Sequence, residues 1–282
     1  MLIAKTIAEV RAAVAKLRAE KKCIGLVPTM GALHEGHLSL VRAAKAQCGA
    51  VVATIFVNPT QFGPNEDFSK YPRTFDADSA LLEKEGVDVL FAPDPAEIYP
   101  SGGSTIVSVA GIQDRLDGRS RPGHFVGVAT VVAKLFNIVQ PDHAFFGQKD
   151  AAQVAVLRRM VRDLHFNLEL VVCPIVREPD GLAMSSRNRY LSTEQRQQAL
   201  VLSRALRRVE AKIAAGVVES AALIDAGLAV LADEPEIRVD YFSIVDPDTL
   251  ENIADVTAGA LVAVAAVVGP ARLIDNVVIP PR

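Results

Sequence analysis

The first 175 residues alternate short apolar runs with longer amphipathic stretches, and this alternation constrains the fold more than any other feature. The runs with the character of buried strands are 23–27, 51–56, 87–91, 142–146 and 168–172. The stretches with helical length and periodicity are roughly 6–19, 37–47, 75–85, 126–139 and 151–163. Because continuous apolar strands separated by helices are typical of a parallel sheet covered on both faces, we expect a Rossmann-like, doubly wound α/β domain.

The pattern changes after about residue 175. Two helical stretches, 191–215 and 221–231, are followed by strand-like runs at 238–245 and 261–268. Helices grouped before strands favour a separate α+β segment. We therefore predict a Rossmann-like ligand-binding domain over 1–175 and a smaller C-terminal domain over 176–282.

Composition excludes several classes of protein. Half of the 282 residues are hydrophobic, the formal net charge is −3 and the sequence pI is about 6.0. This balance gives no support for binding nucleic acid or an anionic membrane surface. The most apolar stretch, 258–268, is too short to span a bilayer, and Thr6 to Glu9 has the pattern of a helix capping box rather than a signal peptide. We expect a cytoplasmic protein.

The chain contains three cysteines, Cys23, Cys48 and Cys173. They are far apart in sequence, form no CxxC pair and lie in or beside apolar stretches. The pattern favours buried thiols in a reducing compartment over metal binding or redox chemistry.

The segment Met30-Gly31-Ala32-Leu33-His34-Glu35-Gly36-His37 joins the first apolar run to the helix that follows it. A helix start offers unpaired backbone N–H groups and the positive end of the helix dipole, which together favour phosphate. Two imidazoles beside it can donate hydrogen bonds to phosphate oxygens whose charge grows during phosphoryl or nucleotidyl transfer. A zinc site is disfavoured, because zinc-binding HExxH sequences place their histidines four apart within a helix, whereas His34 and His37 are three apart with Gly36 between them. The segment predicts a nucleotide site.

Further polar loops follow strands of the predicted sheet, at the edge where ligands of such folds bind. They are 57–62, which contains Asn58 and Gln61, and 147–150, which contains Lys149. Gln61 offers a hydrogen-bond donor and an acceptor to a small polar substrate, and Lys149 offers a point charge to phosphate. Each loop also has a plainer interpretation. The loop 57–62 can be a simple proline turn, and Lys149 in the loop 147–150 can be a solvent-facing lysine.

Two other loops are rich in cations. The run Met184-Ser185-Ser186-Arg187-Asn188-Arg189 follows Gly181 and suits a flexible strap over phosphates, and an exposed loop with incidental arginines explains it equally well. The segment 119–125 is basic, contains Gly and Pro, and leads into a helix, so we interpret it as a mobile cover.

Taken together, these segments resemble the pantoate–β-alanine ligase family. The residues from His34 to His37 match the HxGH motif of the nucleotidylyltransferase superfamily, which class I aminoacyl-tRNA synthetases share. The HxGH motif alone is weakly specific for the family, whereas six blocks in the family's order are strongly specific. The last ninety residues carry no comparable motif. The blocks are 28–37, 56–62, 71–74, 121–125, 146–150 and 184–188.

The resemblance implies an ATP-dependent, AMP-forming carboxylate–amine ligase. The pantoate carboxylate would attack the α-phosphate of ATP, releasing pyrophosphate and forming pantoyl adenylate. The amine of β-alanine would then displace AMP to give pantothenate. The resemblance also implies a homodimer and a requirement for Mg²⁺ with ATP.

Roles for individual residues follow from the same resemblance. His34 and His37 would contact the ATP phosphates, with His37 as the proton donor and with Lys149 and Arg187 as catalytic cations. Pantoate and β-alanine would be bound by Gln61, Gln153, Asn58 and Tyr71. The segment Met184 to Arg187 would be the counterpart of the KMSKS loop, carried by the second domain. The remaining positions that would line ATP are Met30, Gly31, Ala32, Leu33, Glu35, Gly36, Gly147, Gln148, Asp150, Val176, Ser185 and Ser186, with the backbone at Val176 against adenine.

The chain departs from the family at the expected metal ligand. The family has acidic residues shortly after the block at 71–74, and Ala77 stands where one of them is expected. Asp78 remains, and it is the candidate Mg²⁺ ligand because Mg²⁺ binds one or two carboxylates together with substrate phosphates.

Two other functions compete with the ligase. A cofactor-adenylating nucleotidyltransferase would share the HxGH motif, but its phosphorylated substrate would need a second cluster of cations, whereas the amide-rich loop around Gln61 suits an unphosphorylated hydroxy acid. A non-catalytic ATP-binding protein would keep its function after loss of His37 or Lys149.

Overall fold

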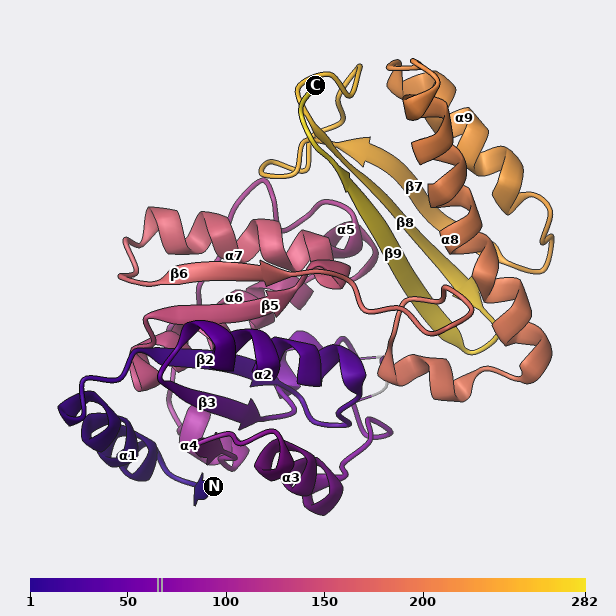
Figure 1. The fold of residues 1–282 in the computed structure, drawn as a ribbon. Coiled ribbons are helices and arrows are strands. Elements are labelled where there is room, and N and C mark those ends of the chain that lie inside the picture. The colour runs from indigo at the N-terminus through magenta and orange to yellow at the C-terminus, as the bar shows by residue number, and fades with distance from the viewer. Residues whose placement is uncertain (65, 67) are drawn as a thin grey trace. The chain divides into compact units, whose positions relative to one another are not determined.

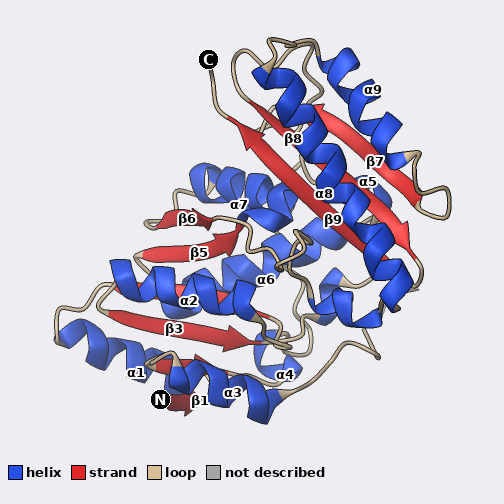
Figure 2. Ribbon diagram, turned by 45° about the vertical axis from the view of Figure 1, so that its right-hand side comes forward, coloured by secondary structure: helices blue, strands red, loops and turns tan. Residues whose placement is uncertain are grey.

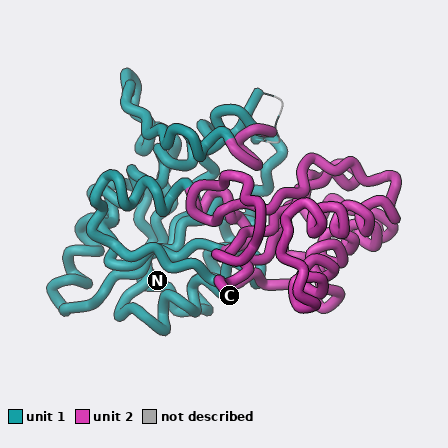
Figure 3. Tube along the Cα trace, turned by 90° about the horizontal axis from the view of Figure 1, so that it is seen from above, with its two compact units in different colours: residues 1–114, 121–147, 156–173 teal, residues 115–120, 148–155, 174–282 magenta. Residues whose placement is uncertain are grey.

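A computed structural model describes residues 1–64, 66 and 68–282. The chain divides into two compact units, coloured separately in Figure 3. Unit 1 comprises Met1–Asp114, Arg121–Gly147 and Val156–Cys173, and unit 2 comprises Arg115–Ser120, Gln148–Ala155 and Pro174–Arg282. Within the described residues, no helix combines the length and the apolar character that crossing a bilayer requires.

Unit 1 is built on a six-stranded parallel sheet with the order β1-β4-β3-β2-β5-β6 (Figure 1). Strand β2 pairs with β3 on one side and β5 on the other. The chain builds β2, β3 and β4 in one direction and then β5 and β6 in the other, so a topological switch point lies between the carboxyl ends of β2 and β5. The strands are β1 (Leu2–Ala4), β2 (Ile24–Thr29), β3 (Ala50–Ile55), β4 (Val89–Phe91), β5 (His143–Gly147) and β6 (Glu169–Cys173).

Helices flank this sheet (Figures 1 and 2). Helix α2 packs on β2 and β5 and touches α3, whereas α1 packs on α6. Thr6 and Glu9 form the predicted capping box at the start of α1. The doubly wound α/β architecture predicted from the apolar runs is confirmed. The helical segments are α1 (Ile7–Ala19), α2 (Glu35–Gln47), η1 (Pro59–Gln61), α3 (Phe75–Lys84), α4 (Pro95–Ile98), α6 (His124–Val139) and α7 (Ala151–Asp163), whose first turns belong to unit 2.

Unit 2 is a two-layer α+β structure. Its antiparallel sheet has the order β7-β8-β9, and α8 and α9 pack on each other and on this sheet (Figures 1 and 2). Strand β8 forms the centre of the sheet and is almost wholly buried, which agrees with the apolar run predicted as a strand. The elements are α5 (Asp117–Ser120), η2 (Gln148–Asp150), η3 (Ser186–Tyr190), α8 (Thr193–Ala214), α9 (Ser220–Leu231), β7 (Arg238–Val245), β8 (Ala260–Val268) and β9 (Ala271–Ile279).

Two strands were not predicted from the sequence. β1 is three residues long and lies at the edge of its sheet, where Leu2 and Ile3 are exposed, so it carries little apolar signal. β9 pairs with β8 along its full length, but Asp275 and Asn276 interrupt its apolar pattern. The side chains of Asp275 and Asn276 are buried, which is uncommon for polar residues in a strand and requires hydrogen-bond partners.

A close backbone contact in unit 1 joins η1 to α6. A Cβ atom at Gly127 would lie 2.4 Å from the carbonyl oxygen of Thr60 and 2.7 Å from the Cα atom of Gln61. Because the atoms at these distances belong to the backbone, rotation of a side chain cannot remove the clash. Glycine at position 127 is therefore what lets η1 lie directly on the helix.

We predict that Gly127→Ala lowers the free energy of unfolding by about 1–3 kcal/mol, the usual cost of overpacking. Gly147→Ala is the matched control, because a Cβ atom there meets nothing within 4 Å. Urea denaturation of both variants measures the difference. Equal stability of the two variants would contradict the packing assigned to Gly127.

Candidate active site

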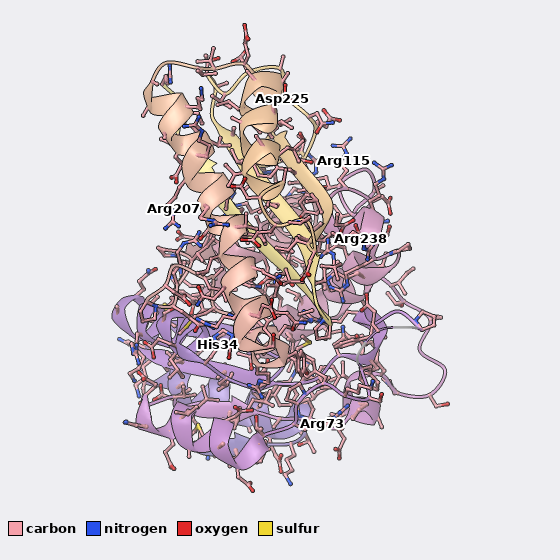
Figure 4. All side chains as sticks on the ribbon, turned by 90° about the vertical axis from the view of Figure 1, so that its right-hand side faces the viewer. His34, Arg73, Arg115, Arg207, Asp225 and Arg238 are labelled. Atoms are coloured by element: carbon pink, nitrogen blue, oxygen red, sulfur yellow. The ribbon has the colours of Figure 1, made fainter. Side chains whose placement is uncertain are left out.

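The turn between β2 and α2 has an unusual backbone. Gly31 has φ of 80° and Ala32 has φ of 52°, and both values lie in the left-handed region. That region is easy for glycine and costs about 1 kcal/mol or more for alanine, so something must hold the turn. His34, labelled in Figure 4, then adopts an extended backbone as the N-cap of α2. Glu35, Gly36 and His37 form the first turn of the helix.

One buried carboxylate holds this turn. Asp78, in the first turn of α3, is 2% exposed. Its Oδ2 accepts hydrogen bonds from the backbone N–H of Ala32 at 2.8 Å and from the Thr74 hydroxyl at 3.0 Å. Its Oδ1 accepts from the backbone N–H of Leu33 at 2.8 Å. These contacts give Asp78 a positioning task, and its role as a Mg²⁺ ligand stays a prediction.

The two histidines of the motif lie against each other at the start of α2. Their ring centroids are 4.1 Å apart and the rings are tilted by 40°. His34 Nδ1 accepts from the backbone N–H of Gly36 at 3.2 Å, and His37 Nδ1 accepts from the backbone N–H of His34 at 3.3 Å. Because a neutral imidazole that accepts at Nδ1 carries its proton on Nε2, both rings are set as Nε2–H donors. This arrangement suits hydrogen bonding to phosphate oxygens.

Gln61 lies at the end of η1 and contacts the same turn. Its Nε2 donates to the Met30 sulfur at 3.0 Å, and its Oε1 accepts from Asn58 Nδ2 at 3.1 Å. The carbonyl of Gln61 lies 2.8 Å from His124 Nδ1. The structure therefore brings together Met30, Asn58 and Gln61, as the sequence analysis expected of residues at neighbouring strand ends.

The side chain of Asn58 makes several hydrogen bonds within this segment and to its neighbours. It is 1% exposed, and its amide donates to the carbonyl of Gly127 at 3.2 Å as well as to Gln61. Its Oδ1 accepts from the Tyr99 hydroxyl at 2.8 Å and the Thr60 hydroxyl at 2.9 Å. Both amide hydrogens and both acceptor positions are thus engaged by protein groups. These contacts orient Gln61, and a direct contact of Asn58 with substrate stays a prediction.

Two residues of the basic loop at 119–125 make contacts beyond it: Arg121 contacts Glu66, and His124 contacts the carbonyl of Gln61. Arg121 binds the Glu66 carboxylate through two nitrogens, each at 2.6 Å, and approaches His124 Nε2 at 2.9 Å. Burial acts to raise the pKa of Glu66, but the hydrogen bonds and charge of Arg121 outweigh it and hold that pKa below its usual value. The pair therefore stays ionised near neutral pH and joins Arg121 to Glu66. The interpretation of the loop as a mobile cover stays a prediction.

Tyr71 lies in an aromatic group beside the same segment. It is 6% exposed, and its ring packs edge-on against Phe62 with centroids 5.8 Å apart. Phe62 also packs against Phe68 at 5.3 Å. The ring contact gives Tyr71 a packing role against Phe62, and its contact with substrate stays a prediction.

A cavity of about 360 Å³ lies in unit 1, lined by residues that follow β2, β3 and β4 and by the start of α3. The described residues that line it include the predicted site residues Met30, Gly31 and Asp78. Phe56 and Phe75 make much of its wall apolar, and Arg73, also labelled in Figure 4, adds a cation. The cavity adjoins the turn on the side of Asp78.

In unit 2, a buried amide fixes the segment that carries Lys149. Asn276, on β9, is 3% exposed and donates to the carbonyls of Gln148 and Lys149, both at 3.0 Å. The Gln148 side chain donates back to Asn276 Oδ1 at 3.0 Å. Lys149 Nζ lies 3.5 Å from the Asp150 carboxylate. Gln153 follows in α7, about one helical turn beyond Lys149.

The neighbouring residue of β9 fixes a second loop. Asp275, 3% exposed, binds the Arg177 guanidinium through both oxygens at 2.7 and 2.9 Å. These hydrogen bonds raise the pKa of Arg177, which stays charged. Arg177 also donates to the carbonyl of Gly181 at 3.1 Å, and the N–H of Met184 donates to the carbonyl of Val176 at 3.0 Å. The structure thus places Val176 and Met184 side by side across a short hairpin.

The strap-like run follows this hairpin into η3. Ser185 is the N-cap of η3, and its hydroxyl accepts from the backbone N–H of Arg187 at 3.2 Å. Asn188 ties the same turn to the Glu178 carboxylate at 2.8 Å. Ser185, Ser186 and Arg187 therefore lie in one local turn.

Sequence reasoning missed the residues that support the site. Asp78 was considered only as a metal ligand, and Gly127, Asp275 and Asn276 were not considered. A signal existed for the last two, since an acid next to an amide inside an apolar strand indicates a buried polar pair. Gly127 lies in an apolar helix, where its close contact with η1 leaves no mark in the local pattern.

The fold and the turn define an α/β protein of the Rossmann-like class whose central strand leads into an HxGH helix start. The family model described as pantoate-beta-alanine ligase matches residues 2–278, and the chain belongs to this family of enzymes. The resemblance on which the sequence analysis rested is thereby confirmed.

Relatives agree over nearly the whole chain. The pantothenate synthetase of Acidobacterium capsulatum is 66% identical, over 98% of this chain and 96% of that protein. The crystal structure of pantothenate synthetase from Thermus thermophilus has a TM-score of 0.94 at 50% identity and covers 100% of both chains. The Francisella tularensis pantoate-beta-alanine ligase, solved with beta-gamma ATP and beta-alanine, has a TM-score of 0.81 at 34% identity, over 99% of this chain and 97% of that one.

We predict that Asp78→Asn weakens ATP binding about tenfold or more, because an amide nitrogen cannot accept the N–H groups of the turn and a lost hydrogen bond to a charged group costs about 1.5–3 kcal/mol. Asp76→Asn, an exposed change on the same helix, is the control. Calorimetric titration with ATP, with and without Mg²⁺, distinguishes the two roles of Asp78. A loss seen only with Mg²⁺ would favour the metal-ligand role over the positioning role.

We predict that Asn276→Ala lowers the free energy of unfolding by about 1–3 kcal/mol, because two partly buried carbonyls lose their donor. ATP affinity falls with it, since Lys149 loses its support. Asn252→Ala, an exposed change in the same unit, should alter neither quantity. Unchanged ATP affinity in Asn276→Ala would show that the amide does not position Lys149.

Proposed function

We propose that this chain condenses pantoate with β-alanine to form pantothenate, using ATP and releasing AMP and pyrophosphate. Support comes from membership of the family, from relatives at up to 66% identity among those compared, and from the pair of Nε2–H donors at the start of α2. That pair is the observation that carries the proposal, because it presents two donors and a helix N-terminus at the carboxyl end of the central strand.

In the first step, a carboxylate oxygen of pantoate attacks the α-phosphorus of ATP, and the bond to the bridging oxygen of pyrophosphate breaks. This displacement needs positioning and charge neutralisation rather than a protein nucleophile. His34 and His37 donate to the phosphate oxygens, and His37 is the proposed proton donor. Lys149 and Arg187 supply positive charge, and Ser185 and Ser186 supply hydroxyl donors to the phosphates.

In the second step, the amine of β-alanine attacks the carbonyl carbon of pantoyl adenylate. The carbon–oxygen bond to AMP breaks, AMP leaves with the bonding pair, and the proton that the amine loses passes to solvent. Gln61 and Gln153 hold pantoate through amide hydrogen bonds, and Gln61 also faces the β-alanine position. A site that reads an unphosphorylated hydroxy acid needs paired donors and acceptors, which amides provide. Asp150 is proposed to hold the ribose and the Val176 backbone the adenine, while Gly147 and Gln148 lie along the nucleotide.

Mg²⁺ is proposed to accompany ATP, held by the phosphates and water. Asp78 is the acid that remains next to Ala77, which stands where the family suggests a ligand. The three hydrogen-bond donors on the Asp78 carboxylate fit an anchor better than a metal ligand. We further propose that the enzyme is a cytoplasmic homodimer, and sedimentation at micromolar concentration tests its assembly.

The experiment that tests the proposed function is ATP–pyrophosphate exchange. We expect exchange of pyrophosphate into ATP that requires pantoate and does not require β-alanine. The reason is that reversal of the first step alone returns pyrophosphate to ATP, and this step does not involve the amine. Exchange that ignores pantoate and depends on a phosphorylated cofactor precursor would instead identify a nucleotidyltransferase.

Two substitutions at His37 test the donor itself. The oxygen of an asparagine takes the place of Nδ1 but offers no donor at the Nε2 position, whereas the nitrogen of a glutamine takes the place of Nε2. We predict that His37→Asn lowers the exchange rate about 100-fold or more and that His37→Gln recovers about tenfold of this loss. His165→Asn, at an exposed histidine, is the control. Exchange at the normal rate in His37→Asn would remove His37 from the reaction.

A further inference from the structure

Two of the three cysteines meet at the amino-terminal edge of the unit 1 sheet. Cys23 directly precedes β2, and Cys48 caps the carboxyl end of α2. Their sulfur atoms are 3.2 Å apart, and both residues are half-buried, whereas Cys173 is buried. The prediction of buried thiols is confirmed for Cys173, whereas Cys23 and Cys48 are only partly buried. The path of α2 returns position 48 to the start of β2.

A histidine completes the cluster. His143 begins β5, where it pairs in register with Gly25 of β2, two residues beyond Cys23. One ligand atom from each of Cys23, Cys48 and His143 lies within 4.8 Å of the others. His143 Nδ1 is buried and makes no hydrogen bond with the described residues, although a Glu169 carboxylate oxygen lies 3.5 Å away. A buried ring nitrogen without a hydrogen bond is unusual and indicates a partner of another kind.

We propose that Cys23, Cys48 and His143 form a binding site for a thiophilic metal ion, of which Zn²⁺ matches the ligand set best. Zinc takes thiolate sulfur at about 2.3 Å and imidazole nitrogen at about 2.0 Å in a tetrahedral arrangement. Such an arrangement separates the ligand atoms by roughly 3.5 Å, so the observed separations need only small side-chain rotations. Water or the Glu169 carboxylate supplies the fourth ligand.

Binding exchanges protons for the metal. Without a cation, burial and the hydrogen bond with Cys23 raise the pKa of Cys48 to about 12, which favours the protonated form of the Cys48 thiol. When Zn²⁺ binds, the two S–H protons pass to solvent, and the two thiolates that remain balance the charge of the ion. The nearby carboxylates of Asp142 and Glu169 favour the incoming cation.

This site is separate from the candidate active site. His34 precedes α2 and Cys48 follows it, and a helix of 13 residues is about 20 Å long. A metal ion here would join the start of β2, the end of α2 and the start of β5. Its expected effect is therefore on stability, and the inference does not depend on the proposed function.

The test is titration of the reduced full-length protein with Co²⁺, followed by displacement with Zn²⁺. We expect one equivalent of Co²⁺ to give a thiolate-to-cobalt charge-transfer band in the near ultraviolet, which histidine-only sites lack. Zn²⁺ should abolish the band and raise the melting temperature by roughly 5 °C at a hundredfold excess over its dissociation constant. Absence of the band in reduced protein, or formation of a Cys23–Cys48 disulfide as the only change, would overturn the proposal.

Variants assign the ligands. Cys48→Ser should remove the band and the thermal shift, and His143→Gln should weaken both at least tenfold. Cys173→Ala and the double variant His34→Ala/His37→Ala are the controls and should keep the band. Circular dichroism checks that each variant is folded. If Cys48→Ser does not fold, His143→Gln provides the test of the ligand set. A band that survives loss of either Cys23 or Cys48 would place the metal elsewhere.

Discussion

The turn held by Asp78 is the constraint on which the rest of the candidate site depends. Ala32 has a backbone conformation that its side chain disfavours, and the buried carboxylate on α3 accepts the N–H groups of Ala32 and Leu33. The direction in which α2 leaves the sheet follows from this turn. The Nε2 atoms of His34 and His37 are aimed by the start of α2, so their usefulness as donors rests on a residue that need not touch a substrate.

In unit 2, buried polar side chains likewise hold the backbone of loops. Asp275 and Asn276 are adjacent polar residues buried in β9, and each holds a different loop. Asn276 fixes the backbone around Lys149, and Asp275 fixes Arg177 at the base of the hairpin that leads to Ser185. In both units, groups proposed to bind ATP lie on turns whose backbone is tied to buried polar side chains of regular structure. This arrangement limits the motion of the binding groups before substrate arrives.

Much of the fold and of the motif could be predicted from the sequence, because continuous apolar runs between helices leave few alternatives to a parallel sheet. Strand β1 was not predicted because its three edge residues carry no periodicity. Strand β9 was not predicted because Asp275 and Asn276 interrupt its apolar run. The role of Asp78 could not be predicted, since an acid in the first turn of a helix is already explained by the helix dipole. The meeting of Cys23 with Cys48 depends on tertiary structure, which sequence separation does not reveal.

In the proposed reaction, a pantoate carboxylate oxygen becomes bonded to the α-phosphorus of ATP. The most direct measurement is mass spectrometry of the products formed from ATP, β-alanine and pantoate labelled with ¹⁸O in its carboxylate. The account predicts one ¹⁸O atom in AMP and none in pyrophosphate. Unlabelled AMP, or label in pyrophosphate or inorganic phosphate, would contradict it.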